Sequence, residues 1–595
     1  MALAGPGTGK TFSLILRIQE LVQARHVLAT DICYLTFIRA IAKAFRSDLQ
    51  EKYPNPEEVE SLRINTVHSL ALRIIRNKGF RIGLDGHLHI LNFADEDDPM
   101  SAFVQTDLVS LLTDSDDIHS RPNLRNSMFA AKSEWQHNSN PNDLTDDNAL
   151  LIDAYSRYSR AFRTLDWDEL IPLATSLYTE EANRPAWLNS LRHILIDEYQ
   201  DFNPAEQGFL SLLCANSSSA VIVGDPDQSI YSGRGASPTG IQTQANDADN
   251  SSVSLVICHR CRARLVEAAN TFLTFMNPDP RLLVPLKTEG IISVKSFRSC
   301  KAEADYLAER LSEILAGVQP DTLPEERPIC LFPSRKVLSQ YKKELEKRGI
   351  RCNARNVLNT LDEKAWLRIC ARLAIQKDQP FLQRILVERF TSLRRRITAI
   401  IELIIQGTPS VILALDELAQ QPGWGAQSEA GAQDYKTFLN RLTSGDPDLV
   451  LLVFNSLLSN NRCSREMVED FLNAADEINL DDFIDSLVSQ VFHETERAHG
   501  DEPVQPAVEL ITMHGSKGLT RRWVFLPGFE QAWIPGNAIN RRLEELKRVF
   551  FVALTRATDE VSITYPKTRA RGDVLNFNIA GRGQRSKFTN NIGVT

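Results

Sequence analysis

The most constraining feature of this 595-residue sequence is AGPGTGKT, at residues 4–11. Its glycines let backbone N–H groups surround phosphate oxygens at a helix N-terminus, where the helix dipole favours an anion. The lysine of such a loop reaches the β- and γ-phosphates, and the threonine that follows binds Mg²⁺. An amphipathic helical pattern continues from Phe12 to Val22. The sequence therefore predicts a phosphate-binding loop. The residues expected to hold the nucleotide are Gly5, Gly7, Thr8, Gly9, Lys10 and Thr11.

A second motif, ILIDEYQD at residues 194–201, supplies two adjacent carboxylates after a short apolar strand. Asp197 at the strand end suits a Mg²⁺ ligand together with Thr11, and Glu198 suits the group that polarises the attacking water. Adjacent carboxylates could instead cap the next helix. Combined with Lys10, the motif favours ATP hydrolysis with Mg²⁺.

Composition and charge exclude several classes of protein. The 43% hydrophobic content and 24% charged content are those of a globular chain of about four domains. No apolar run is long enough to span a membrane, and the N-terminus does not resemble a signal peptide. The nine cysteines do not form a disulfide framework, and the one CxxC pair, Cys258 and Cys261, has no second pair to complete a zinc site. The net charge of −9 lies within residues 95–147, so it does not exclude a nucleic-acid partner.

Strand-like and helical patterns alternate in two regions and are interrupted by helical ones. Short apolar runs at residues 32–37, 193–196 and 220–223 predict strands of a first parallel sheet. Runs at residues 291–294, 328–332, 508–513 and 523–527 predict a second sheet. The ligand site is expected at the carboxyl ends of the strands.

Taken in order, the motifs resemble those of superfamily 1 DNA helicases of the UvrD/Rep/PcrA type. Thr36-Phe37 with Ala42 is similar to TFTNKAA, residues 66–70 to TFHSL, and residues 197–201 to DEFQD. Residues 224–231 resemble GDxDQSIY, residues 514–519 HxxKGL, and residues 552–557 VALTRA.

The resemblance implies an α/β fold of two RecA-like P-loop NTPase domains, each with a mainly helical insertion. Residues 1–75 and 178–260 would form the first RecA-like domain, around an acidic insertion at 76–177. Residues 261–360 and 501–566 would form the second, around an insertion at 361–500. A basic flexible tail would follow at 567–595, since residues 567–587 carry six bases and one acid.

The resemblance also implies roles for individual residues. Gln228 would sense the γ-phosphate, and Arg260 and Arg556 would approach it from the second domain, where an arginine contributes about 10³–10⁵ in rate. His259 stands where the family places a tyrosine on the adenine. The expected contacts to single-stranded DNA are base stacking by Phe37 and Tyr231 and backbone contacts by Thr66, His68 and Lys517.

The sequence departs from the family pattern at several positions. Gly233 replaces an aromatic residue, Thr520 replaces a glutamate, and Arg39-Ala40 replaces Asn-Lys. Only three residues precede Ala4, which is too few for a strand of about five residues and leaves no room for the family's adenine-reading glutamine motif. We expect either a start that lies too far downstream or relaxed adenine recognition.

The sequence leaves two interpretations for one cluster of arginines. Arg384, Arg389 and residues 394–396 could contact duplex phosphates, or they could form a solvated helix face.

The sequence as a whole predicts an ATP-dependent 3′→5′ translocase and helicase acting in DNA repair, replication or recombination. Its expected partners are single-stranded DNA, duplex junctions and repair or replication proteins, with no membrane. Its expected location is cytoplasmic, or nuclear in a eukaryote. The alternatives are a degenerate helicase-like DNA-binding protein and a translocase that strips proteins from DNA with little unwinding. No nuclease-like cluster follows the last motif.

Overall fold

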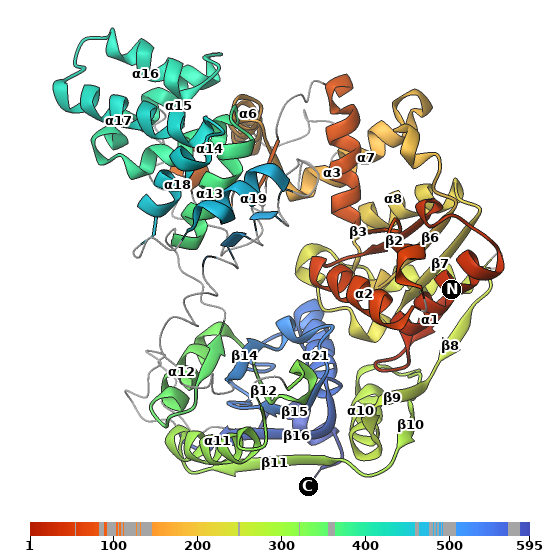
Figure 1. Cartoon of the computed structure of the whole chain (residues 1–595). Helices are drawn as coiled ribbons and strands as arrows, with labels where there is room; N and C mark the ends of the chain where they lie inside the picture. Colours follow the sequence, from red (N-terminus) through yellow and green to blue (C-terminus); the bar gives the residue numbers. More distant parts are fainter. Residues whose placement is uncertain are drawn as a thin grey trace. The chain divides into compact units, whose positions relative to one another are not determined.

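The computed structural model describes most of the chain as two compact units. The described residues are 1–53, 55–82, 88–91, 146–247, 250–319, 322–354, 363–458, 463–474, 507–568 and 584–594, with scattered helical residues within 103–131 and 480–491. The first unit comprises residues 1–70, 185–356 and 502–595, and the second comprises residues 71–184 and 357–501 (Figure 1). Most of the acidic segment 95–147 lies outside the described residues. Within the described ranges, no helix is both long enough and apolar enough to cross a membrane.

The first sheet has six parallel strands in the order β3-β2-β6-β7-β1-β8. They are β1 (Ala2–Ala4), β2 (Ile32–Thr36), β3 (Arg63–Thr66), β6 (His193–Ile196), β7 (Ser219–Gly224) and β8 (Val253–Leu255). Helices α1 (Lys10–Gln19) and α2 (Arg39–Lys52) pack apolar side chains onto this sheet. The strands predicted at 32–37, 193–196 and 220–223 are confirmed, and all the motif loops of this half follow strand carboxyl ends.

The expectation that too few residues precede Ala4 for a strand is wrong. Strand β1 has only three residues, but it lies between β7 and β8, with Ala2 opposite Val223 on one side and Val253 on the other. Ala4 is fully buried. Partners on both sides satisfy the backbone groups of β1, so a strand shorter than the usual length forms.

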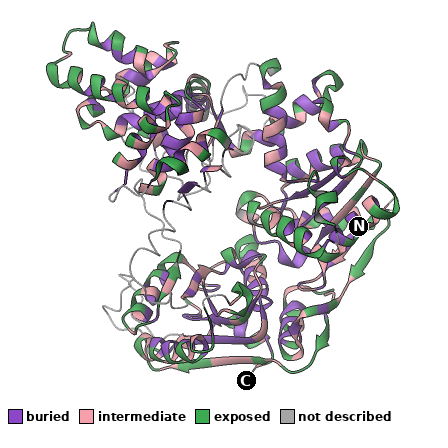
Figure 2. Cartoon of the chain, viewed as in Figure 1, coloured by how far each residue is buried: buried purple, intermediate pink, exposed green. Residues whose placement is uncertain are grey.

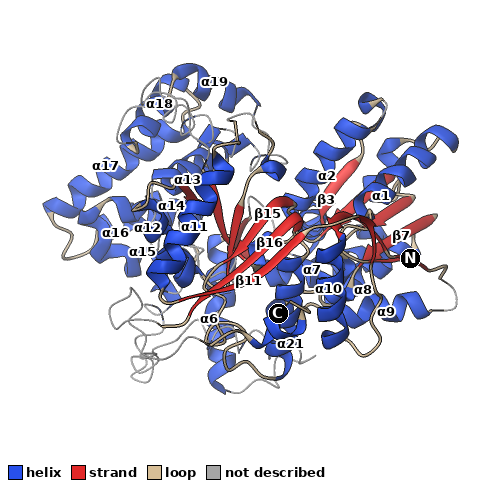
Figure 3. Cartoon of the chain, turned by 90° about the horizontal axis from the view of Figure 1, so that it is seen from below, coloured by secondary structure: helices blue, strands red, loops and turns tan. Residues whose placement is uncertain are grey.

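The second sheet also has six parallel strands, in the order β11-β16-β15-β12-β14-β13 (Figure 3). They are β11 (Ile291–Phe297), β12 (Ile329–Phe332), β13 (Cys352–Ala354), β14 (Val508–Thr512), β15 (Arg521–Leu526) and β16 (Ala557–Pro566). Side chains that alternate along these strands form two cores, because helices cover both faces. The helices are α10 (Ala263–Met276) and α21 (Asn540–Leu554) on one face, and α11 (Cys300–Leu315) and α12 (Arg335–Glu346) on the other.

The predicted flexible tail is wrong for its last part. Phe588 and Ile592 are 1% exposed and belong to the core beside α10 and α21. The Ser586 hydroxyl donates to the carbonyl oxygen of Ile534 over 2.6 Å. Burial of these apolar side chains helps to dock a segment that is otherwise rich in polar residues. Residues 569–583 lie outside the described residues.

The second unit is mainly helical, and its two chain segments share one core. Figure 2 marks the buried residues of this unit in purple. Its main helices are α6 (Asp146–Phe162), α7 (Leu170–Thr179), α13 (Glu363–Ile375), α14 (Pro380–Leu386), α15 (Ile397–Ile405), α16 (Val411–Ala419), α17 (Ala426–Thr443), α18 (Pro447–Ser456) and α19 (Arg465–Ala474). Apolar side chains of α6 pack together with those of α13 to α19. The segments that the sequence analysis treats as separate insertions therefore form one compact body.

Candidate active site

The phosphate-binding loop joins β1 to α1. Gly7 and Gly9 have φ angles of 70° and 89°, in the left-handed region that favours glycine, and α1 begins directly after them at Lys10. A Cβ added at Gly9 would meet no atom within 4 Å, so open space lies above the helix N-terminus. The Lys10 ammonium group donates to the carbonyl oxygens of Ala4 and Gly5, over 3.0 and 3.2 Å. The loop therefore has the shape, the helix end and the cation that a polyphosphate requires.

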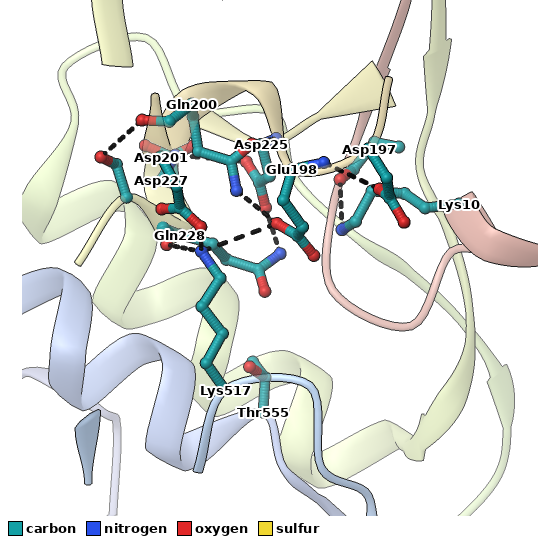
Figure 4. A network of polar contacts seen from close by, with 12 residues as sticks. Lys10, Asp197, Glu198, Gln200, Asp201, Asp225, Asp227, Gln228, Lys517 and Thr555 are labelled. Atoms are coloured by element: carbon teal, nitrogen blue, oxygen red, sulfur yellow. Dashed lines mark hydrogen bonds and ion pairs between the residues drawn. The ribbon is translucent and has the colours of Figure 1, made fainter. Parts of the chain in front are cut away.

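Asp197 and Glu198 follow the end of β6, beside this loop (Figure 4). The Asp197 carboxylate accepts from the Tyr34 hydroxyl over 3.0 Å and from the Glu198 backbone N–H over 2.8 Å. Burial and then repulsion by Glu198 raise the pKa of Asp197 to about 6. Burial also raises the pKa of Glu198, but attraction by Lys517 and Lys10 outweighs it and holds that pKa at about 2. Both groups are thus carboxylates at neutral pH, as a Mg²⁺ ligand and a general base must be.

The backbone of Glu198 is held in an unusual conformation. Its φ angle is 55°, in the left-handed region, which costs about 1–3 kcal/mol for a residue with a side chain. The Gln200 amide donates to the Glu198 carboxylate, and its carbonyl oxygen accepts from the Asp225 backbone N–H over 2.9 Å. Gln200 therefore fixes Glu198 against the loop after β7, and this contact stabilises the conformation.

Gln228 is the centre of a buried polar network that reaches the second sheet (Figure 4). Its amide nitrogen donates to Asp225 over 2.6 Å. Its side-chain oxygen accepts from the Arg556 guanidinium over 3.2 Å, and its backbone oxygen accepts from Lys517 over 2.8 Å. The Lys517 ammonium group also pairs with Asp201. A single glutamine therefore contacts both halves of the first unit.

Two arginines, Arg260 and Arg556, lie near this network. Arg556 is 3% exposed, and burial, then the nearby charge of Arg260, lowers its pKa to about 9, so it stays charged at neutral pH. The Arg260 guanidinium donates to the carbonyl oxygen of Thr555 over 3.3 Å. On the adjacent residue, the exposed His259 donates its backbone N–H to the carbonyl oxygen of Gly7 over 2.8 Å. Arg260 thus stands beside the phosphate-binding loop, and Arg556 stands beside Gln228.

Comparison with known proteins identifies the family. The UvrD/REP helicase N-terminal domain matches residues 1–249, and the UvrD-like helicase C-terminal domain matches residues 458–568. The ATP-dependent DNA helicase Rep of Escherichia coli (strain K12) is 24% identical over 625 residues, covering 96% of this chain and 89% of the relative. The chain belongs to the UvrD/Rep/PcrA-type superfamily 1 DNA helicases.

Two further relatives of this helicase cover the chain almost completely. The ATP-dependent DNA helicase PcrA of Bacillus subtilis (strain 168) is 24% identical over 625 residues, covering 98% of this chain and 82% of the relative. The DNA helicase II of Rickettsia typhi (strain ATCC VR-144 / Wilmington) is 25% identical over 625 residues, covering 96% and 90%. The similarity thus extends through both halves of the helicase.

Of the residues predicted to bind DNA, the helicase brings two aromatic side chains together. The rings of Phe37 and Tyr231 are half-buried and lie 5.1 Å apart between centroids. The Phe202 ring packs edge-on against the Phe37 ring, with 5.7 Å between the ring centroids. Phe37 follows β2 and Tyr231 follows the loop after β7, so parallel topology brings them to the same sheet edge.

The predicted backbone contacts of Lys517 and His68 do not fit their surroundings. The Lys517 side chain is 1% exposed, inside the network around Gln228. His68 is 5% exposed, its Nε2 lies 3.3 Å from the Glu206 carboxylate, and burial lowers its pKa to about 3. Thr66 is 3% exposed, and its hydroxyl accepts the Ser69 backbone N–H over 3.1 Å at the start of the next helix. All three side chains are enclosed by protein groups, so a contact to the DNA backbone would require a rearrangement, and these contacts stay predictions.

The arginine cluster of the second unit was expected either to contact duplex phosphates or to form a solvated helix face, and its members differ in their surroundings. Arg384 is 1% exposed and pairs with Asp107 over 2.5 Å and with Glu388 over 3.0 Å, so it is neither a DNA contact nor a solvated charge. The Arg389 guanidinium lies 5.1 Å from the centre of the Trp366 ring. Arg389, Arg394 and Arg395 of the cluster are exposed, and Arg396 is half-buried. Arg384 and Asp107 thus form a buried ion pair between the two chain segments of the second unit.

Sequence reasoning missed four residues of the nucleotide site. Tyr34 donates a hydrogen bond to Asp197, and Gln200 donates one to Glu198. Asp225 accepts a hydrogen bond from the Gln228 amide and another from Arg281, the latter over 3.0 Å. Gln200 belongs to the motif at residues 197–201 and Asp225 to the motif at residues 224–231, so the sequence could have indicated both. Tyr34 and Arg281 lie outside those motifs, and only the fold brings them in.

Proposed function

We propose that this helicase uses ATP and Mg²⁺ to translocate 3′→5′ on single-stranded DNA and to separate duplex strands at junctions, in DNA repair, replication or recombination. The observation that carries the proposal is the position of Gln228. It accepts hydrogen bonds from Lys517 and Arg556 of the second half and donates to Asp225 of the first. A residue so placed transmits any displacement at the nucleotide to both halves.

In this proposal the first half binds the nucleotide. Gly5, Gly7, Thr8 and Gly9 surround the phosphates, and Lys10 leaves its contacts with the loop carbonyls for the β- and γ-phosphates. Thr11 and Asp197 would hold Mg²⁺, and the open space above Gly9 fits the phosphate group that accompanies the ion. The ion would supply neutralisation of charge on the transferred phosphoryl group.

The remaining roles follow from charge and reach. Glu198, ionised at neutral pH, orients the attacking water and accepts its proton. Arg260 and Arg556 stabilise charge that spreads over the oxygens of the transferred group. His259, exposed beside the loop, suits a contact to the base.

Translocation requires DNA contacts that respond to the nucleotide. Phe37 and Tyr231 supply stacking surfaces, which tolerate any sequence. Tyr231 lies three residues beyond Gln228, and its ring centre is 5.6 Å from the Lys517 ammonium nitrogen. A shift of Gln228 therefore acts on a candidate DNA contact through a short and packed route. The two RecA-like halves that we assign to 1–75 with 178–260, and to 261–360 with 501–566, would open and close around each ATP. Such a role on chromosomal DNA suits a cytoplasmic location, or a nuclear one in a eukaryote.

ATP hydrolysis with and without single-stranded DNA is the first test. Lys10→Ala and Glu198→Gln should each abolish DNA-stimulated turnover, while Lys301→Ala, an exposed lysine on α11, should not change it. Glu198→Gln should still bind nucleotide, because the lost group acts on the water. Unchanged turnover in either site variant would refute the assignment.

Strand separation and direction need a second assay. Forked duplexes with only a 3′ or only a 5′ single-stranded tail should be unwound from the 3′ tail alone. Unwinding from the 5′ tail would overturn the polarity. Turnover without unwinding would favour a protein-stripping translocase. DNA binding without turnover would instead indicate a degenerate helicase.

A further inference from the structure

Two cysteines of strand β9 (Ile257–Arg262) have no part in the proposed chemistry, although they lie beside it. Cys258 is fully buried and Cys261 is 2% exposed. Neither forms a disulfide in this structure. They flank His259 and Arg260, so any covalent change at the pair acts on a candidate phosphate-binding arginine.

A bulge brings the two cysteines to the same side of the strand. Residues three apart on a regular strand point to opposite faces. In the parallel pairing of β9 with β10 (Val284–Lys287), Cys258 lies opposite Pro285 and Arg262 lies opposite Lys287. Four residues along β9 therefore correspond to two along β10, which is the register shift of a bulge. The backbone N–H of Cys261 consequently donates to the Cys258 sulfur over 3.5 Å.

The pair stands between the phosphate-binding loop and Thr555, the residue before Arg556. A Cβ added at Gly7 would lie 3.1 Å from the Cys258 sulfur. On the other side, the Cys261 sulfur lies 3.7 Å from the carbonyl oxygen of Thr555. Movement of either sulfur therefore disturbs a loop of the nucleotide site.

The two thiols differ in acidity as a reactive pair requires. The hydrogen bond from the Cys261 thiol is the main cause that lowers the pKa of Cys258 to about 6, assisted by backbone N–H groups and opposed by burial. The same contact, together with burial, raises the pKa of Cys261. The thiolate is the nucleophilic form of cysteine, and a nearby thiol resolves the first oxidation product.

We propose that Cys258 and Cys261 form a peroxide-sensitive dithiol that, on oxidation to a disulfide, slows ATP turnover. The Cys258 thiolate attacks one oxygen of hydrogen peroxide, the O–O bond breaks, and a sulfenic acid and hydroxide form. The Cys261 sulfur then attacks the Cys258 sulfur, the S–OH bond breaks, and hydroxide leaves. The Cys261 proton and one proton from solvent complete two waters. The two sulfurs lose two electrons to the peroxide, and an external dithiol reverses the step.

A disulfide requires the sulfurs to lie about 2.05 Å apart. Its formation therefore shifts at least one sulfur from its present position beside Gly7 or Thr555. Arg260 lies between the two cysteines in the sequence, so the disulfide would also displace its side chain. The predicted loss of turnover rests on the proposed function, but formation of the bond does not.

The test uses the full-length reduced protein, treated with hydrogen peroxide and then with an alkylating agent. Mass spectrometry of the peptide containing both cysteines should show loss of two hydrogens and no alkylation. Turnover should fall by about tenfold or more, since an arginine at the phosphoryl group contributes at least that much, and dithiothreitol should restore it. A non-hydrolysable ATP analogue should slow the reaction by closing the site around the pair.

Variants keep the outcomes distinct. Cys258→Ser and Cys261→Ser should each show the same turnover before and after peroxide, with Cys258→Ala as the substitute should serine disturb folding. Cys214→Ser is the matched control, because that thiol is half-buried and its pKa is raised to about 12, and this variant should stay peroxide-sensitive. Full alkylation of both thiols after peroxide would overturn the inference, as would equal loss of turnover in Cys258→Ser. Absence of turnover in the reduced protein would refute the proposed function instead, and binding of a fluorescent ATP analogue would then report the effect of the disulfide.

Discussion

Replacing Lys517 with methionine tests the buried charge network that joins the two halves of the first unit. The Lys517 side chain is 1% exposed, and its ammonium group pairs with Asp201 and donates to the carbonyl oxygen of Gln228 over 2.8 Å. Removing one partner of a buried ion pair leaves the other charge uncompensated and costs about 3–5 kcal/mol. Unfolding entropy scales with chain length, so in the first unit this loss lowers Tm by about 4–7 °C.

The loss should depend on pH, with a sign set by Asp201. Burial raises the pKa of Asp201 to about 7 even though Lys517 attracts its charge. Without the lysine the folded-state pKa rises further, whereas the unfolded value stays at about 3.9. Between these values the folded variant binds more protons than the unfolded chain, so its stability falls as pH rises through the folded pKa. The difference in Tm from the unmodified protein should therefore be small at about pH 6 and largest at about pH 8.5.

Thermal unfolding followed by circular dichroism at the two pH values measures this difference. Adding Asp201→Asn to Lys517→Met removes the buried carboxylate, so the double variant should be more stable than the single one and lose the pH dependence. Lys301→Met, at an exposed lysine, controls for the loss of a charge alone. A loss that is equal at both pH values, or that Asp201→Asn does not reduce, would refute the reasoning.

Three further perturbations test separate parts of the molecule. Arg281→Ala releases the aspartate that holds Gln228, so kcat should fall by about tenfold with little change in KM for ATP, and Arg281→Lys should recover part of it. Arg384→Met leaves Asp107 buried and unpaired in the second unit, which should lose about 3–5 kcal/mol in denaturant unfolding and regain part of it when Asp107→Asn is added. Phe37→Ala should weaken single-stranded DNA binding by about five-fold to a hundredfold in a fluorescence titration, with unstimulated ATP turnover unchanged.

The strands and their common edge could be predicted because they depend on local pattern. Buried parallel strands are short apolar runs, and the runs at 193–196 and 220–223 correspond to β6 and β7 within one residue. Once parallel strands are assumed, the residues after each strand must gather at one edge. The approach of Asp197 to the phosphate-binding loop therefore followed from topology.

Burial of polar residues could not be predicted in the same way. The motifs containing His68 and Lys517 indicate a functional region but not the partner that encloses each side chain. Glu206 and Asp201 lie far from them in the sequence, and only long-range packing brings each pair together. Strand β1 was misjudged for a related reason, since its stability comes from the neighbours β7 and β8 and not from its length.

The enclosed polar side chains explain how a site for a small nucleotide can act on a long polymer. Phe37 directly follows β2, three residues after Tyr34, which donates to the Asp197 carboxylate. Tyr231 is connected through Gln228 and Lys517 to Arg556 and Glu198. Each candidate stacking ring is thus within a few contacts of a group that a nucleotide would touch. Groups so tightly packed have few alternative arrangements, so in the proposed function a change at the phosphates would be transmitted to the rings as a discrete displacement. Burial thus suits these residues to the proposed coupling between DNA contacts and ATP.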